Sequence, residues 1–283
     1  MNKGITKKLK TKKFSKTLIM NQMNSIIKNF QAGKNLQNIA LVKLCIVCTF
    51  CLFASVLHAQ TTEKIAWDYP IKPGTEQWRQ FKSMEEMYQA CQIPDNLLKK
   101  LDTESLTDIC LNYPAPPTFL VFDTPQQAFM AYYFNFNGIQ ELYKRKDAGH
   151  YLLKKYATMS FSDFNPLWPL HQQGQFVSHY KFVETILAQP QIISSLDAKD
   201  RKSLLRETIS KMDEKLEKND LFGGFSIEIN LWTVLVSFHS QNKSLLREYD
   251  QQNLQTAIET GMFVDIDADM LYQQAKKYAY ENE

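Results

Sequence analysis

Acidic side chains are missing from the first 62 residues of this chain, which contain no aspartate or glutamate. Ten lysines lie within the first 43 residues, so the chain from residue 63 onward carries 23 Lys and Arg against 30 Asp and Glu. The body of the protein is therefore acidic, although the formal charge of the whole chain is +3. An acidic body argues against nucleic acid as a partner, because phosphates attract basic proteins.

An apolar run separates these two compositions. It covers residues 44–57 without interruption and lies within the longer stretch 39–59. A basic leader followed by an apolar core of this length is typical of an export signal. We expect residues 1–59 to be a basic leader and signal peptide, cut between Ala59 and Gln60, and the protein to act in the periplasm, at the cell surface or after secretion. The alternative is a membrane anchor formed by residues 39–59, which are long enough to span a bilayer.

Glycine is also scarce, with nine residues in the whole chain. A β-sandwich would need many glycine-rich turns and regular short alternating runs. Leucine, lysine, glutamine and glutamate instead recur at helical spacing. We therefore expect residues 60–283 to form a single all-α domain, with an extended N-terminal strap around Trp67 and Pro70.

The arrangement of the helices is left open by the sequence. A pattern of paired apolar residues recurs from Leu97, Leu152, Ile192 and Leu245, as in stacked helical repeats. The intervals are irregular, so we weigh an irregular α-solenoid or stacked helical pairs equally against a compact orthogonal helix bundle.

Several short signals predict where helices begin and end. Capping patterns predict starts at Ser83, Thr124 and Asp197. The Asn137-Gly138 pair predicts a turn, and Gly223-Gly224 predicts the end of a helix.

Only two cysteines follow the leader, Cys91 and Cys110. An exported chain with one cysteine pair favours a disulfide, and segments 84–91 and 104–111 would bring the sulfurs together if they were antiparallel neighbours. Two buried free thiols are the alternative, because packing alone also favours buried cysteine.

Five sequence segments resemble a group of uncharacterised exported proteins from gut anaerobic bacteria. They lie between residues 65 and 160 and read as Trp67-x-Tyr69-Pro70-x-Lys72-Pro73-Gly74, Ala90-Cys91-Gln92-Ile93-Pro94, Cys110-Leu111-Asn112-Tyr113-Pro114, Phe136-Asn137-Gly138 and Arg145-Lys146-Asp147-Ala148-Gly149. The resemblance implies export and supports a bond between the two cysteines. It implies no activity.

Motifs for metal, phosphate or acyl-transfer chemistry are absent from the sequence, which has no H-E-x-x-H, no phosphate loop and no G-x-S-x-G elbow. His171 and His179, with Asp163 and Glu184, are the best metal candidates, but their spacing is poor for one helical face. The alternating acidic residues 265, 267 and 269 fit a helix start better than a calcium loop. We therefore expect neither a metal nor a cofactor.

Aromatic residues are abundant, and three of them could form a surface for a ligand: Trp168, Phe176 and Tyr180. Core packing is the alternative for all three. Together these observations favour an exported, non-catalytic binding or interaction module of the cell envelope, with a protein, peptide or glycan as its partner. The alternative is a carboxylate-dependent hydrolase that uses residues such as Glu141, Asp147 or Glu184; the sequence does not assign its catalytic residues.

Overall fold

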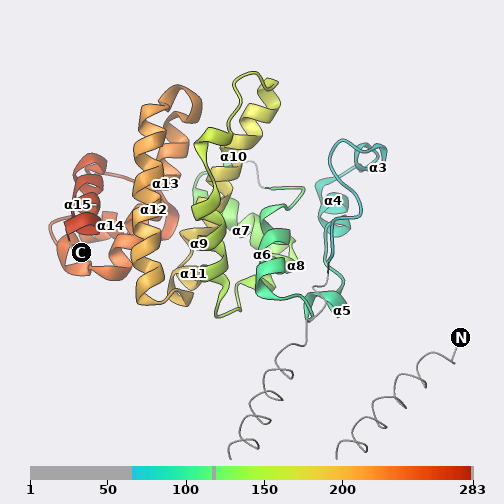
Figure 1. The fold of residues 1–283 in the computed structure, drawn as a ribbon, viewed down its shortest axis with the longest axis horizontal. Helices are drawn as coiled ribbons and strands as arrows, with labels where there is room; N and C mark the ends of the chain where they lie inside the picture. The colour runs from blue at the N-terminus through green and yellow to red at the C-terminus, as the bar shows by residue number, and fades with distance from the viewer. Residues whose placement is uncertain (1–65, 117–118, 282–283) are drawn as a thin grey trace, which may run out of the picture. The chain divides into compact units, whose positions relative to one another are not determined.

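The computed structural model describes residues 66–116 and 119–281, apart from the side chain at position 120. Residues 63–283 form one compact unit. The predicted leader, its cleavage site and the anchor alternative lie outside the described residues. Within them the chain forms helices and connecting segments but no β-strand, so the predicted all-α class is confirmed (Figure 1).

The first half of the described chain begins with a non-helical segment, residues 66–75, and continues in short helices. These are α3 (Glu76–Arg79), α4 (Met84–Ala90), α5 (Asp95–Leu98), α6 (Thr103–Leu111), η2 (Phe119–Val121), α7 (Pro125–Asn135), α8 (Asn137–Leu142), α9 (Ala148–Thr158) and η3 (Phe161–Asp163).

The second half contains the longest helices. These are α10 (Leu170–Leu187), α11 (Pro190–Ser195), α12 (Ala198–Glu217), α13 (Asn219–Gln241), η4 (Lys243–Leu246), α14 (Gln251–Thr260) and α15 (Ala268–Glu281). Helices α12 and α13 pack side by side (Figure 1), α10 packs on α13, and α15 packs on both α12 and α13.

Local capping chemistry explains several of the helix starts. The side chains of Ser83, Thr124 and Asp197 each accept a hydrogen bond from the backbone amide three residues later. These bonds satisfy amides that have no partner within the helix. The three predicted starts are therefore confirmed.

The two glycine-containing signals have different outcomes. The break after α7 occurs at Phe136, which is extended, and Asn137-Gly138 opens α8 instead of forming the turn. Gly223 is non-helical, with a φ of 67°, and it separates the first residues of α13 from the rest of that helix, so a helix does break there as predicted. This left-handed conformation suits glycine because it has no Cβ.

Helix α13 lies at the centre of the second half. Among the described helices it alone is long and apolar enough to cross a membrane, but 67% of its apolar window is buried inside the fold. The four similar sequence segments fall in or beside α5, α9, α11 and η4. They therefore do not mark one repeated element.

The N-terminal strap packs against the helices as expected. The hydroxyl of Tyr69 donates to the backbone carbonyl of Ile109 in α6 at 2.7 Å. The ring of Tyr69 also packs on Tyr113 and Phe136, with centroids 6.2 Å away in both cases. The predicted strap around Trp67 and Pro70 is therefore confirmed.

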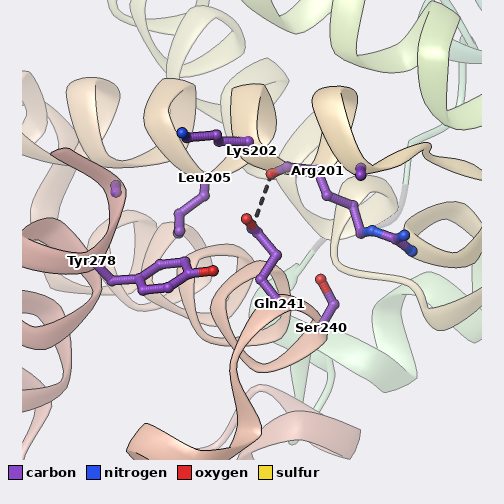
Figure 2. A pocket seen from close by; sticks show the side chains of 8 residues that line it. Arg201, Lys202, Leu205, Ser240, Gln241 and Tyr278 are labelled. Atoms are coloured by element: carbon purple, nitrogen blue, oxygen red, sulfur yellow. Dashed lines mark hydrogen bonds between the residues drawn. The ribbon is translucent and has the colours of Figure 1, made fainter. Parts of the chain in front are cut away.

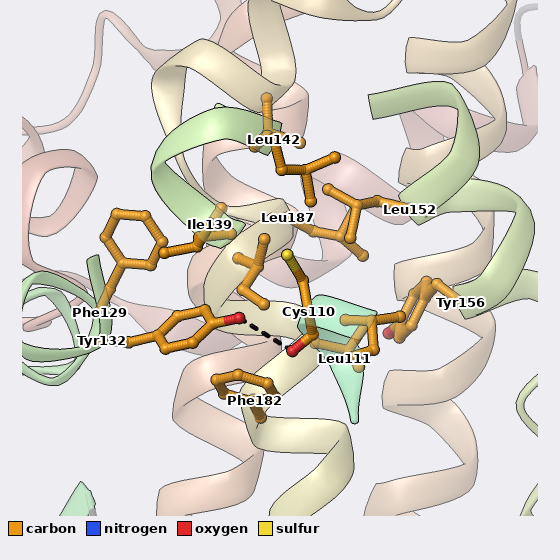
Figure 3. Close-up of a cluster of buried hydrophobic side chains, with 14 of the residues drawn as sticks. Cys110, Leu111, Phe129, Tyr132, Ile139, Leu142, Leu152, Tyr156, Phe182 and Leu187 are labelled. Atoms are coloured by element: carbon orange, nitrogen blue, oxygen red, sulfur yellow. Dashed lines mark hydrogen bonds between the residues drawn. The ribbon is translucent and has the colours of Figure 1, made fainter. Parts of the chain in front are cut away.

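Cys91 and Cys110 are both buried free thiols, so the predicted disulfide is not formed in the structure. Helix α6 packs mainly on α8 and α9, and the two free thiols are the alternative that the sequence left open. Figure 3 shows Cys110 among Tyr132, Ile139 and Leu187, with the Tyr132 hydroxyl donating to the Cys110 carbonyl at 2.9 Å. Burial raises the pKa of the Cys91 thiol to about 11 and that of Cys110 further.

The segment after Cys91 is held by α7 and α8 through two amide side chains. Gln92 donates to the carbonyl of Asn135 at 2.8 Å and accepts from the amide of Asn137 at 3.0 Å. Asn137 in turn donates to the carbonyl of Ile93 at 2.7 Å and accepts from its amide at 3.0 Å. The side-chain amides of Gln92 and Asn137 therefore stabilise the fold, because they hydrogen-bond backbone groups that have no partner within the loop.

Candidate functional site

We consider two pockets of the described chain, of which the larger is an open groove of about 870 Å³. It is bounded by the strap, the end of α6 with the segment that follows it, and α10. A pocket of this size lies within the usual range for small ligands. None of the residues predicted as a ligand surface lines it.

One wall of the groove is aromatic and belongs to the strap. Trp67 packs edge-to-face on Tyr69, with ring centroids 4.8 Å apart. Tyr69 is fixed by its bond to Ile109, and Pro70 and Pro73 restrict the backbone after it. The half-buried indole of Trp67 is thus held at the groove by a stiff segment.

The opposite wall is a stripe on α10. Gln175, Ser178, His179 and Phe182 lie on one helical face because their spacing is three or four residues. The first three side chains are exposed and make no hydrogen bond or ion pair with the described residues. They therefore offer amide, hydroxyl and imidazole groups to the groove, while buried Phe182 contributes to its floor.

His179 carries the one imidazole of this groove. Although its edge is exposed, the surrounding walls remove part of its hydration, and this desolvation lowers its pKa. Its ring is therefore neutral at pH 7, with one nitrogen as donor and the other as acceptor.

The carboxylates at the groove are already paired with lysines. Asp68 accepts from Lys72 at 2.5 Å, and Asp108 is 2.6 Å from Lys155. The hydrogen bond from Lys72 is the main cause of a lowered pKa at Asp68. The groups left for a ligand are thus mostly uncharged.

Of the three aromatics predicted as a ligand surface, Tyr180 is in the core, while Trp168 and Phe176 are half-buried and pack beside it. Tyr180 is 1% exposed and stacks on Phe161 at 4.5 Å. Phe176 packs between Tyr180 and Trp168, with centroids 5.3 and 6.0 Å away. Helical spacing alone did not distinguish a core stripe from a ligand platform.

The three carboxylates of the hydrolase alternative lie in different places. Glu141 pairs with Arg145 at 3.0 Å, and Asp147 accepts from the Thr103 hydroxyl at 2.9 Å. Glu184 is fully buried. None of the three lines either pocket.

Glu184 forms a buried charge cluster with Lys215. The ammonium of Lys215 lies 2.8 and 2.6 Å from the two carboxylate oxygens and donates to the carbonyl of Ser226 at 3.2 Å. Tyr156 and Asn230 also donate to Glu184, at 2.9 and 2.8 Å. Burial lowers the pKa of Lys215, while its partner opposes that shift. The cluster joins α9, α10, α12 and α13 in the interior, and its residues line neither the groove nor the pocket between α12, α13 and α15.

The predicted metal candidates are likewise separated. His179 faces the groove, Glu184 is buried in the ion pair, and His171 lies exposed near the start of α10. Residues 66–116 and 119–281 contain no group of three or more potential ligands that could hold a metal ion. The acidic segment caps α15, since Asp267 accepts from the amide of Met270 at 2.9 Å.

A smaller pocket of about 410 Å³ lies where α12, α13 and α15 meet. Figure 2 shows Arg201, Gln241 and Tyr278 on its walls. The amide of Gln241 donates to the carbonyls of Arg201 and Ser237, at 3.0 and 3.1 Å. The side chain of Gln241 thus links α13 to α12. None of the site residues predicted from the sequence lines this pocket.

Comparisons with known protein families, curated proteins and solved structures found no match to this chain. The groove is the larger of the two candidate sites. Its strap wall could be anticipated from the sequence, because Trp67 and Tyr69 were expected in the strap, but the facing stripe on α10 was missed.

Proposed function

We propose that this chain is an exported, non-catalytic binding protein whose groove binds a neutral oligosaccharide. The observation that carries the proposal is the pairing of an aromatic wall with a stripe of uncharged polar side chains. The C–H face of a sugar ring packs on an indole such as Trp67. Its hydroxyls can exchange hydrogen bonds with Gln175, Ser178 and His179.

The charge arrangement supports a neutral ligand over an ionic one. Lys72 and Lys155 already neutralise Asp68 and Asp108. An anionic or cationic ligand would have to compete with these pairs. A neutral ligand would leave them in place.

A carboxylate-dependent hydrolase is the second candidate, because Asp68, Asp108 and His179 line one groove. Glycoside hydrolysis needs a carboxylic acid whose pKa is raised so that it can donate a proton. Asp68 has a lowered pKa, which supports binding over hydrolysis. Release of shorter sugars from a neutral hexasaccharide, and its loss in Asp108→Asn, would favour the hydrolase instead.

Export is proposed from the acid-free basic leader and its apolar core. Intact mass of the protein recovered outside the cytoplasm should correspond to a chain that begins at Gln60. A recovered chain that retains residues 39–59 would favour the membrane anchor.

Binding is tested by isothermal titration calorimetry of the full chain. The probes are neutral hexasaccharides (cellohexaose, xylohexaose and mannohexaose), a hexamer of uronic acid and a proline-rich decapeptide. We expect at least one neutral hexasaccharide to bind, and Trp67→Ala to weaken it by about tenfold or more, equivalent to ~1.4 kcal/mol. The uronic acid hexamer should bind more weakly.

Trp78→Ala is the matched control, because Trp78 is also a half-buried indole near the strap but packs on Phe81 outside the groove. It should leave the affinity unchanged. Failure of every neutral hexasaccharide would reject this ligand class. Peptide binding that is weakened by Trp67→Ala would support the groove as a binding site but with a peptide, not a sugar, as its ligand.

A further inference from the structure

Two leucines near the start of α10 are almost completely exposed. Leu167 is 89% exposed and Leu170 is 85% exposed, more than any other large hydrophobic residue of the described chain. They belong to the segment from Asn165 to Leu170, which we call the leucine tip. It lies at the upper end of α10 in Figure 1.

Aromatic side chains support the tip from below. Trp168 packs against Phe164 and Phe176, with ring centroids 6.0 Å away in both cases. Phe164 and Phe176 contact each other at 5.5 Å. The exposed leucines therefore project from a packed base.

The backbone of the tip makes most of its own hydrogen bonds. The amides of Leu167 and Trp168 donate to the side chain and the carbonyl of Asn165, at 2.9 and 3.0 Å. The side chain of Gln173 donates to the carbonyls of Pro166 and Trp168, at 3.1 and 2.7 Å. Pro166 and Pro169 have no amide to satisfy. Such bonding lowers the cost of removing a non-helical loop from water.

Charge is absent from this part of the chain. No Asp, Glu, Lys or Arg occurs from Phe164 to Tyr180. A charged side chain would oppose burial in an apolar medium, whereas leucine favours it and tryptophan and proline are well tolerated at a membrane interface.

We propose that the leucine tip inserts into the interfacial region of a lipid bilayer and holds the folded domain at a membrane surface. The tip is a projection of paired leucines and presents no polar group pattern for a specific protein partner, which favours lipid over a protein pocket. Its neutrality means that insertion depends on apolar contact and not on anionic headgroups.

Hydrogen exchange of the full chain, measured by mass spectrometry, tests the proposal locally. It reports protection of the leucine tip separately from any protection that arises through residues 1–65. The amides of Leu170 and His171 open α10 without a capping side chain, so we expect them to exchange freely in the absence of a membrane. The probes are phosphatidylcholine vesicles and vesicles with a third of phosphatidylglycerol, each at low and high salt. We expect slower exchange across residues 165–171 with both vesicles, unchanged by salt.

Leu167→Ser/Leu170→Ser should raise the lipid concentration for half-maximal protection by about tenfold or more. Leu245→Ser is the matched control, because Leu245 is also exposed, at 45%, but lies in η4. It should leave the protection unchanged. Thermal unfolding should show that all variants fold, since the replaced side chains are exposed.

Three results would overturn the proposal. One is the absence of protection with either vesicle, including the case in which protection needs an added protein. Another is protection that requires phosphatidylglycerol and disappears at high salt, which would indicate headgroup electrostatics. The third is equal protection in Leu167→Ser/Leu170→Ser and the parent chain.

Discussion

Among single residues of the described chain, Lys215 and Glu184 are costly to replace one at a time. Both side chains are fully buried, so each charge depends on the other for compensation. Removing one partner from such a pair leaves an uncompensated charge in the interior. The pair could not be predicted from the sequence because its members lie 31 residues apart on different helices.

We expect Lys215→Met to lower the free energy of unfolding by about 3–5 kcal/mol. Glu184→Leu in the same chain should recover part of this loss, because the unpaired charge is then removed, although Tyr156 and Asn230 still lose an acceptor. Urea unfolding followed by circular dichroism measures both changes.

Lys276→Met is the matched control for this experiment. Lys276 contacts both oxygens of Asp213, at 2.7 and 2.8 Å, but both side chains are 38% exposed. Its loss should lower the free energy of unfolding by about 0–1 kcal/mol. Equal effects of Lys215→Met and Lys276→Met would contradict the role of burial.

Between elements, the contact of α9 with α11 depends on the absence of a side chain at Gly149. The amide of Gly149 donates to the hydroxyl of Ser195 at 2.8 Å. A Cβ at this position would lie 2.7 Å from the carbonyl of Ile192, which is too close. The glycine therefore allows the two helices to approach each other.

Gly149→Ala should lower the free energy of unfolding by about 1–3 kcal/mol, since the new methyl group forces α9 and α11 apart. Gly174→Ala should have the opposite sign, because nothing lies within 4 Å of the Cβ at that position in α10. There alanine should raise stability by about 0.5–1 kcal/mol through helix propensity. Urea midpoints that move in the same direction for both variants would refute this account.

Sequence signals located helices well where the cause was local. Ser83 and Thr124 cap their helices with side chains three residues from the amides they satisfy. The sequence signals failed where contacts with residues far away in the chain determine the conformation. The turn predicted at Asn137-Gly138 is an example, because Asn137 bonds to Ile93, 44 residues earlier, and the pair opens α8.

At the scale of the whole molecule, tyrosine hydroxyls are distributed through the interior. Burial raises the pKa of several of them above the usual value of 10, namely Tyr69, Tyr113, Tyr132, Tyr156, Tyr180 and Tyr272. These groups stay protonated in the folded protein at a pH where the unfolded chain has lost the protons. Their contribution to stability is present below pH 10 and is lost as the pH rises above it.

We expect the free energy of unfolding to fall above pH 10.5, by ~1.4 kcal/mol per pH unit for each such tyrosine. Lys215 has the opposite sign, because its pKa is lowered by folding, but its effect ends near ~10.4, the pKa of an unfolded lysine. Tyr132→Phe should make the slope shallower by the contribution of one tyrosine. Urea unfolding between pH 10.5 and 11.5 tests this, and an unchanged slope would contradict it.

The candidate site illustrates the limit of prediction at this scale. Trp67 and Tyr69 could be assigned to a strap from the prolines around them, but the helix that faces them lies more than 100 residues later. Trp168, Phe176 and Tyr180 have the spacing of a helical face, and only the packed structure shows that Tyr180 is in the core. Long-range contacts, and not local patterns, create the groove.

The strap has a consequence for the order of events during synthesis. Trp67 leaves the ribosome about 115 residues before Phe182, the last residue of the opposite wall. At ~5–20 residues per second this delay is roughly 6–23 s. Throughout that interval the indole of Trp67 lacks the α10 wall of the groove, and the ring of Tyr69 lacks Tyr113 and Phe136 until those residues emerge. The segment is therefore a natural contact for a chaperone while the chain is still growing.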